Sequence, residues 1–556
     1  MGDSGGQFLI KKNLKLGDLD AETDQRLLKD CFFDKGDMEV IADTEEPESV
    51  VVGRTGSGKS ALLLKLAIEN DKARVLDPND ISIKFLENSD IIKFFESIGV
   101  KLDLFYKLLW RHILTIEFLK LRYGFKEGEN NSGILQRLTE LGASKGKKKA
   151  IEYFNKWNDQ FWVETDKHLK EIVEKFTDEV KGEIGVGVGG IGGISVADVE
   201  GLTQERRHEV VNKANRVVSQ LQIRSLSEVI DVLSEESFKD FQQKYYILID
   251  KLDEDWATTE TRCLFVRALI EEVKFFRKLS NTKIVVALRE DLLQKVFDMT
   301  RGSGFQQEKY ESYLYPLKWG KEDLRILIEK RVSEVYKRQY EKRDVKFDEV
   351  FPSPKQGVVA FSFMVERTLF RPRDILQFCN ECFVASYNKP RVSWRSIRSA
   401  EHKYSQKRLQ SIIEEWVDHY PSVRFVPELF YGLPPNLKKS SFGDSRINEV
   451  ASRAFEVEGK DACIEAAEKM VSADAKSTSG KEFLVECLKV AYRVGIIGVK
   501  AGGNNPFFWA HIDKPEISKS EINRVEKIKV HKMFYHALDL NLRFDDDAFI
   551  EDDSSL

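Results

Sequence analysis

Residues 53–60 read Gly-Arg-Thr-Gly-Ser-Gly-Lys-Ser, and this segment limits the possible fold more than any other part of the chain. It follows a short, mostly apolar run that predicts a strand, and it leads into an apolar stretch that predicts a helix opening at Ser60. The spacing G-x-x-x-x-G-K-[ST] between a strand and a helix is the pattern of a phosphate-binding loop, or P-loop. The glycines Gly53, Gly56 and Gly58 let the backbone turn its N–H groups inward, and the helix directs the positive end of its dipole toward an anion.

Two further segments predict strands of the same sheet. Residues 244–249 and 283–288 are nearly continuous apolar runs, and they end at Asp250 and Arg289. A helical stretch, residues 261–278, separates them. Strands that are apolar along their whole length and alternate with helices indicate a parallel sheet buried on both faces. The sequence therefore predicts an α/β fold built on a P-loop NTPase parallel sheet.

The rest of the chain predicts helical additions to this core. Residues 493–509 read as a strand, a turn and a second strand after several helices, which is the order of a winged helix. Residues 183–196 alternate glycine with β-branched residues and predict either a hairpin or a flexible loop. We expect, in order, a lead-in (1–45), a P-loop ATPase core (46–335) with a large helical insertion at about 85–240, a helical lid (336–410), a C-terminal winged-helix domain (411–515), and a C-terminal helix with an acidic tail (516–556).

Composition bears on where the chain acts and what it binds. The 556 residues include 87 basic and 92 acidic side chains, a net charge of -5, so there is no general attraction for nucleic acid or anionic lipid. The most apolar long helix, residues 104–123, is interrupted by charges throughout, and the first residues lack a secretory signal. Six cysteines are too sparse for a disulfide framework. We expect a cytoplasmic protein that makes no membrane contact.

The P-loop and the end of the strand before Asp250 predict a site for a nucleotide with magnesium. Lys59 can reach the β and γ phosphates, and the Ser60 hydroxyl can ligate Mg²⁺. Mg²⁺ needs a carboxylate opposite the loop. Asp250 follows a buried strand that we expect beside the P-loop strand, so it is the predicted second metal residue.

Three downstream residues are the predicted catalytic groups. Asp253 and Glu254 follow Asp250 closely, and either can orient the attacking water; the alternative is an exposed acidic loop. Arg289 either stabilises charge on the γ phosphate or forms a salt bridge with the carboxylates next to it.

The sequence favours ATP over GTP as the nucleotide. Residues 250–253, Asp-Lys-Leu-Asp, are close to the guanine-reading pattern N-K-x-D, but Asp250 replaces its asparagine. Using this segment for the base would also leave no evident carboxylate for Mg²⁺.

Together these residues resemble the AAA+ and STAND-type P-loop ATPases, including the NACHT and origin-recognition-like branches. Residues 246–254 are similar to the STAND Walker B pattern, apolar residues followed by D-x-h-D-E, and Arg289 would correspond to sensor 1. Residues 371–374 look like the sensor-2 position of a lid, which would bring Arg371 and Arg373 to the nucleotide; interdomain packing is the alternative. Residues 16–22 are similar to the lead-in of bacterial stand-alone ATPases.

The resemblance implies an ATP-binding, slowly ATP-hydrolysing regulatory switch that controls its own assembly or a partner effector, in anti-phage defence or DNA maintenance. The expected partners are a homo-oligomer or an effector protein. The alternatives are a DNA-binding initiator or loader that uses the winged helix, and a nucleotide-binding scaffold with negligible turnover. The residues predicted to contact the nucleotide are Gly53, Arg54, Thr55, Gly56, Ser57, Gly58, Lys59, Ser60, Ala61, Arg371 and Arg373.

Overall fold

The described residues of the computed structural model form two compact units. Unit 1 comprises Met1–Phe33, Thr55–Gly58 and Lys318–Leu556, and unit 2 comprises Asp34–Arg54 and Lys59–Leu317. The structure describes residues 9–78, 90–100, 102–124, 152–154, 173–180, 194–200, 202–219, 242–254, 259–299, 307–340, 344–471, 478–502 and 505–542. Most of the glycine-rich stretch 183–196 and the acidic tail lie outside these ranges.

Unit 2 is built on a five-stranded parallel sheet in the order β2-β3-β4-β1-β5. The parallel sheet of the predicted fold class is therefore present. The strand before Asp250 is β3, and it does not lie beside the P-loop strand β1 as we predicted, because β4 pairs with both of them. The strands are β1 (Val50–Gly53), β2 (Ala73–Leu76), β3 (Tyr245–Ile249), β4 (Thr282–Arg289) and β5 (Leu314–Pro316).

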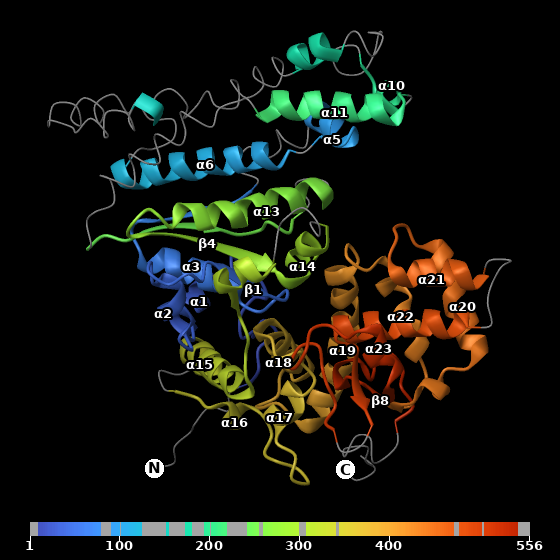
Figure 1. Cartoon of the computed structure of the whole chain (residues 1–556). Helices are drawn as coiled ribbons and strands as arrows, with labels where there is room; N and C mark the ends of the chain where they lie inside the picture. The colour runs from blue at the N-terminus through green and yellow to red at the C-terminus, as the bar shows by residue number, and fades with distance from the viewer. Residues whose placement is uncertain are drawn as a thin grey trace. The chain divides into compact units, whose positions relative to one another are not determined.

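Helices cover both faces of this sheet (Figure 1). α3 (Lys59–Glu69) lies on one face, and α6 (Asp103–Tyr123) and α13 (Thr259–Phe276) lie on the other. A bidentate ion pair of 2.8 Å joins Arg111 of α6 to Glu272 of α13. The two-sided cover explains why β3 and β4 are apolar along their whole length.

The remaining described elements of unit 2 are helices, several of them within the predicted insertion at about 85–240. These elements are α2 (Asp37–Ala42), α5 (Asp90–Ser97), α10 (Val196–Glu200), α11 (Gln204–Ser219), α14 (Glu290–Met299) and the 3-10 helix η2 (Gln307–Tyr313).

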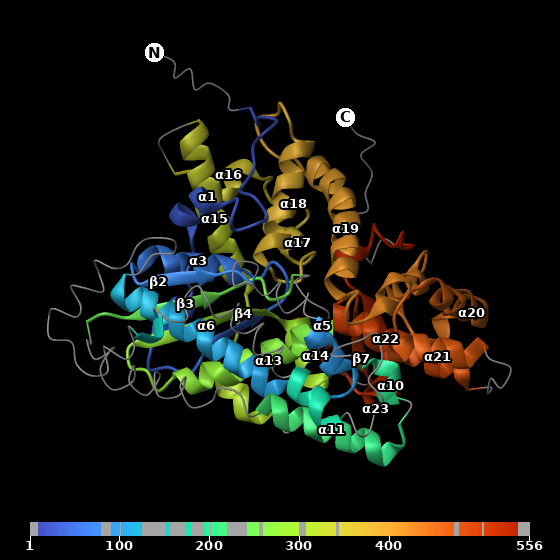
Figure 2. The same cartoon turned by 90° about the horizontal axis from the view of Figure 1, so that it is seen from above.

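The first half of unit 1 is helical, and the lead-in of the chain packs within it. The Leu16 N–H donates to the Asn380 side chain at 2.8 Å, and buried Asp24 pairs with Arg331 at 2.6 Å. α18 and α19 lie side by side (Figure 2). The helices are α1 (Gln25–Cys31), α15 (Lys321–Gln339), α16 (Phe347–Val350), α17 (Ala360–Val365), α18 (Pro372–Ala385) and α19 (Trp394–Trp416). The predicted lid segment is thus helical, and its action as a lid stays a prediction.

The second half of unit 1 combines short helices with a three-stranded antiparallel sheet in the order β6-β8-β7. Its strands are β6 (Asn436–Leu437), β7 (Ile497–Ala501) and β8 (Val525–Val530). Its α-helices are α20 (Asp444–Arg453), α21 (Ala462–Val471), α22 (Ser479–Val494) and α23 (Lys519–Asn523). Its 3-10 helices are η3 (Pro421–Arg424), η4 (Val426–Phe430), η5 (Lys439–Ser441), η6 (Ala454–Glu456) and η7 (Lys532–Phe534).

Two predictions for this region are wrong in detail. β7 pairs with β8, and Phe508 of the predicted hairpin makes only an isolated bridge to Val499. Residues 516–542 contain a short helix followed by β8, where we predicted a C-terminal helix. The apolar residues of β8 are buried against β7, and this long-range pairing decides the structure over local pattern. None of the described helices is both long and apolar enough to cross a membrane.

Candidate functional site

The P-loop has the backbone that its glycines predict. Gly56 and Gly58 have φ angles of +79° and +97°, in the left-handed region that favours glycine. Gly53 is the last residue of β1, and α3 begins at Lys59, one residue earlier than predicted. The loop therefore connects a buried strand to a helix N-terminus, which is a favourable place for a phosphate group.

Three successive carbonyls at the tip of the loop are bonded within unit 1. The Thr55 carbonyl accepts from Arg371 Nη1 at 3.0 Å, and the Gly56 carbonyl accepts from the Arg373 N–H at 3.2 Å. The Ser57 carbonyl accepts from Trp319 Nε1 at 2.7 Å. In a planar trans peptide the carbonyl of one residue points opposite to the N–H of the next. The N–H groups of Gly56, Ser57 and Gly58 therefore point away from these three partners.

Lys59, Ser60 and Asp250 are the three unit 2 residues at the centre of the prediction. Lys59 is buried, and its Nζ donates to the carbonyls of Gly53 at 2.9 Å and Arg54 at 3.3 Å. The Ser60 hydroxyl is hydrogen-bonded to the Asp250 carboxylate. The structure thus brings together the loop lysine, the loop serine and the carboxylate that follows β3, although β4 separates β3 from β1.

The environment of Asp250 suits a cation. Burial raises the pKa of this carboxyl group, while the hydrogen bonds from Ser60 and Lys251 and the charge of Lys59 oppose the shift. A serine hydroxyl and a carboxylate are oxygen donors, which Mg²⁺ prefers, and magnesium sites use few protein ligands beside water and phosphate. Among the described residues no group of three or more His, Cys, Asp or Glu side chains forms a separate metal site. Ser60 and Asp250 fit a magnesium ion brought by a nucleotide.

The loop after β3 is held by residues that we did not predict. Lys251 has a φ angle of +61°, and its Nζ pairs with Asp77 at 3.3 Å. Arg262 of α13 donates to the carbonyls of Asp253 and Glu254 at 3.2 and 3.1 Å. Asp77 follows β2, the neighbour of β3, so its place at a strand end was an available signal. Arg262 has no such signal in the sequence.

Arg289 forms the salt bridge that we gave as one of its two alternatives. Its guanidinium binds both oxygens of Asp291, at 2.9 and 2.6 Å, and lies 3.4 Å from the Asp253 carboxylate. Arg289 and Asp253 are therefore neighbours at the carboxyl ends of β4 and β3. A role toward the γ phosphate stays a prediction.

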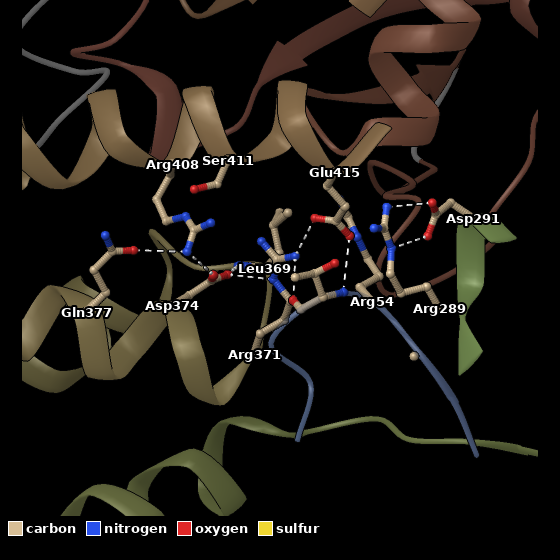
Figure 3. A network of polar contacts seen from close by, with 12 residues as sticks. Arg54, Arg289, Asp291, Leu369, Arg371, Asp374, Gln377, Arg408, Ser411 and Glu415 are labelled. Atoms are coloured by element: carbon tan, nitrogen blue, oxygen red, sulfur yellow. Dashed lines mark hydrogen bonds and ion pairs between the residues drawn. The ribbon is translucent and has the colours of Figure 1, made fainter. Parts of the chain in front are cut away.

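Arg371 lies between two carboxylates, Asp374 and Glu415 (Figure 3). Burial by itself lowers the pKa of Arg371, but these two charges outweigh it and raise the pKa above its ordinary value. Arg373 contributes its N–H to the loop, and its side chain donates to the Leu19 carbonyl at 3.0 Å. Contact of either side chain with a nucleotide stays a prediction. We did not predict Glu415, because the sequence does not distinguish it from Glu414 beside it.

Comparisons with known proteins add distant relatives. Residues 322–413, from α15 into α19, match the model of a FunZ-associated C-terminal helical domain. The chain is 21% identical over 546 residues to a putative transposon gamma-delta 80.3 kDa protein of Escherichia coli (strain K12), covering 96% of this chain and 68% of that protein. It is 26% identical over 129 residues to the allergen Alt a 2 of Alternaria alternata, covering 23% of this chain and 68% of the allergen.

Among solved structures, a Walker-type ATPase of Pyrococcus abyssi aligns with 89% of this chain and 98% of its own, at 13% identity and a TM-score of 0.31. The parallel sheet, the P-loop and the covering helices of this chain fit a P-loop NTPase.

Proposed function

We propose that the chain binds ATP with Mg²⁺ at the P-loop and hydrolyses it slowly. The observation that carries this proposal is the hydrogen bond between the Ser60 hydroxyl and the half-buried Asp250 carboxylate. These groups come from opposite sides of a long insertion, and their meeting is what a shared cation requires. The N–H groups of Gly56, Ser57 and Gly58 bind phosphate oxygens, and Lys59 leaves its loop carbonyls to bind the β and γ phosphates. A bound Mg²⁺ would neutralise charge on the phosphates.

The two acidic residues after β3, Asp253 and Glu254, have different proposed roles in hydrolysis. Asp253 lies within 3.4 Å of Arg289, so its charge is already opposed. Glu254 is exposed, and Arg262 holds its carbonyl. We assign the orientation of the attacking water to Glu254, and to Asp253 and Arg289 the positioning of the loop and of charge near the γ phosphate.

Nucleotide binding and turnover test the site directly. Titration of fluorescent ATP and GTP, with and without Mg²⁺, should show affinity for ATP that Lys59→Ala lowers about 100-fold or more, because the lysine charge on the phosphates is lost. Glu254→Gln should bind ATP normally and release phosphate about 10²- to 10⁴-fold more slowly, whereas Asp253→Asn should retain more activity. Wild-type protein with no affinity for any nucleoside triphosphate at millimolar concentration would refute the proposal.

The biological role that we propose is a regulatory switch that acts on its own assembly or on a partner effector protein. The support is architectural, because unit 1 contributes the loop tip and also carries the helical and C-terminal segments. Nucleotide at the loop can therefore bias the state of those segments. Sizing of the purified chain with ATP, ADP and no nucleotide, together with a pull-down from its host, tests this role.

DNA binding is the second candidate, favoured by the order of α20, α21, α22, β7 and β8, which agrees with a winged helix. Two of the three cations of α22 argue against it. Arg493 is buried with its guanidinium over the Trp416 ring, and Lys489 pairs with Glu486 at 2.7 Å. Binding to duplex DNA that weakens steeply with salt would support this alternative.

A further inference from the structure

One buried ion pair holds both backbone groups of Thr55. The Thr55 N–H donates to Glu415 Oε1 at 3.2 Å, and the Thr55 carbonyl accepts from Arg371 Nη1 at 3.0 Å. The same Nη1 donates to Glu415 Oε2 at 2.9 Å, and the Arg371 and Glu415 side chains are 4% and 3% exposed. We call Arg371 and Glu415 the Thr55 clamp. All three residues belong to unit 1.

The clamp is fixed to both α18 and α19 (Figure 3). Arg371 Nε donates to Asp374 at 3.0 Å, and Asp374 also lies 3.2 Å from Arg408 of α19. Withdrawal of Glu415 would leave a buried guanidinium with one of its two counter-charges missing, which is strongly unfavourable. The clamp therefore moves together with the two helices.

The residue after Glu415 belongs to the core of the C-terminal segment. Trp416 is buried, its ring lies under the Arg493 guanidinium of α22 at 5.1 Å, and it stacks on Tyr420. Earlier in α19, the Ser405 hydroxyl donates to the carbonyl of Met533, which follows β8, at 2.6 Å. Consecutive residues of a helix point about 100° apart. The last turn of α19 thus contacts the loop tip on one side and the C-terminal segment on another.

The peptide between Thr55 and Gly56 is where nucleotide would act on the clamp. Its carbonyl is bonded to Arg371, and its N–H is one of the groups that bind phosphate in the proposed function. Since the peptide is planar, a phosphate that orients the N–H also orients the carbonyl that Arg371 holds.

We propose that the Thr55 clamp couples nucleotide at the P-loop to the C-terminal segment, through the last turn of α19 and Trp416. Binding of the triphosphate changes the equilibrium for local unfolding of α22. Because coupling between two sites is reciprocal, unfolding of α22 changes the nucleotide affinity by the same factor. This inference rests on the proposed function and adds a regulatory route to it.

Hydrogen exchange in the full-length protein tests the coupling. Amides of α22 should exchange at rates that differ about 5- to 150-fold between MgATP-bound and nucleotide-free wild type, the usual range for coupled sites. Glu415→Ala should still bind MgATP but lose this difference. Glu415→Gln, which keeps the shape and an acceptor for the Thr55 N–H, covers the case in which the alanine variant does not fold, and it should reduce the difference.

The matched control is Glu414→Ala. Glu414 precedes Glu415 on α19 but is exposed and accepts from Gln410 one turn earlier, at 2.8 Å, so its variant should match the wild type. Suppose that wild type binds MgATP and that MgATP changes α22 exchange equally in wild type and both Glu415 variants, or in none of them. Either outcome refutes the coupling while the proposed function stands. Failure of the wild type to bind nucleotide would instead refute the proposed function.

Discussion

Gly56 shows how one position of the P-loop is restricted twice. Its φ angle of +79° disfavours any side chain, and an added Cβ would lie 2.5 Å from Arg373 Cβ. At Gly58 an added Cβ would meet only the Trp319 ring, at an ordinary 3.7 Å. The motif thus places a glycine at 56 for its backbone, and the packing of Arg373 then leaves room for nothing larger.

Gly56→Ala should therefore be more harmful than the same change at a free turn. Gly357 has the same φ of +79° with nothing within 4 Å of an added Cβ, so Gly357→Ala should cost only the backbone strain, about 1–2 kcal/mol. Gly56→Ala adds the overlap with Arg373 and should lower both the free energy of unfolding and ATP affinity further. Chemical denaturation and nucleotide titration of both variants measure this. Equal unfolding losses would show that Arg373 yields freely.

We expect the Asp250 carboxylate to lower the free energy of unfolding and to be needed for Mg²⁺ binding. Because burial raises its pKa, its charged form is disfavoured in the folded state, so this group weakens folding as pH rises through its folded pKa. Asp250→Asn should then raise Tm at neutral pH without nucleotide, and the gain should shrink in acid, where the wild-type carboxyl group is also neutral. The same variant should lose the Mg²⁺-dependent part of ATP affinity. A lower Tm at neutral pH would contradict this account.

At the scale of elements, α19 is joined to the segment after α17 by a buried pair. Arg367 binds Glu401 of α19, both almost fully buried, and the Arg367 guanidinium lies 3.5 Å from the Phe363 ring centroid. Burial raises the pKa of Glu401, but Arg367 and His536 outweigh it and lower the pKa to about 2. This pair fixes α19, whose last turn carries Glu415.

Arg367→Met should lower the free energy of unfolding by about 3–5 kcal/mol, because it leaves Glu401 buried without its main partner. Arg398 binds the other Glu401 oxygen at 3.4 Å from a half-buried position, so Arg398→Met should cost less than Arg367→Met. A carboxyl group whose pKa is lowered by folding stabilises the folded state at pH values above its ordinary pKa. The contribution of Glu401 should therefore be complete above about pH 5 and lost as pH falls toward 2. Denaturation of both variants at several pH values measures this, and equal losses would contradict it.

At the scale of the whole molecule, the chain passes between the two units four times. Unit 1 collects the lead-in, the four-residue tip of the P-loop and the C-terminal half of the chain. The lead-in is anchored there by Asp24, whose pair with Arg331 is buried, and by the Leu16 carbonyl, which accepts from Arg331 at 2.8 Å. Residues far apart in sequence are thus needed for one folding unit.

Asp24→Ala should consequently destabilise unit 1 selectively. Amides of α15 and α18 should exchange faster by hydrogen exchange, while those of β3 and β4 should keep their wild-type rates, because units open separately. Asp18→Ala is the control, since the Asp18 side chain pairs with Lys15 at 3.5 Å, both side chains are exposed, and the hydrogen bond from its backbone N–H to Asp24 is kept. Faster exchange throughout unit 2 would show instead that the chain unfolds as one body.

Local chemistry in the sequence was enough to predict the loop and the parallel sheet, and to name Ser60 and Asp250 as residues of one site. A glycine pattern, a strand end and a run of apolar residues depend on neighbours within a few positions, so they can be read without the rest of the chain. The same local reading placed β3 beside β1 and a second hairpin strand before Trp509, and it was wrong in both cases.

Only the tertiary structure decided which residues surround the loop. Thr55 and Glu415 are 360 positions apart, and Glu414 and Glu415 are chemically identical neighbours. One faces solvent and the other binds the loop because of how α19 packs on α18. The order of strands and the choice of buried partner depend on long-range packing free energy, which no local pattern contains.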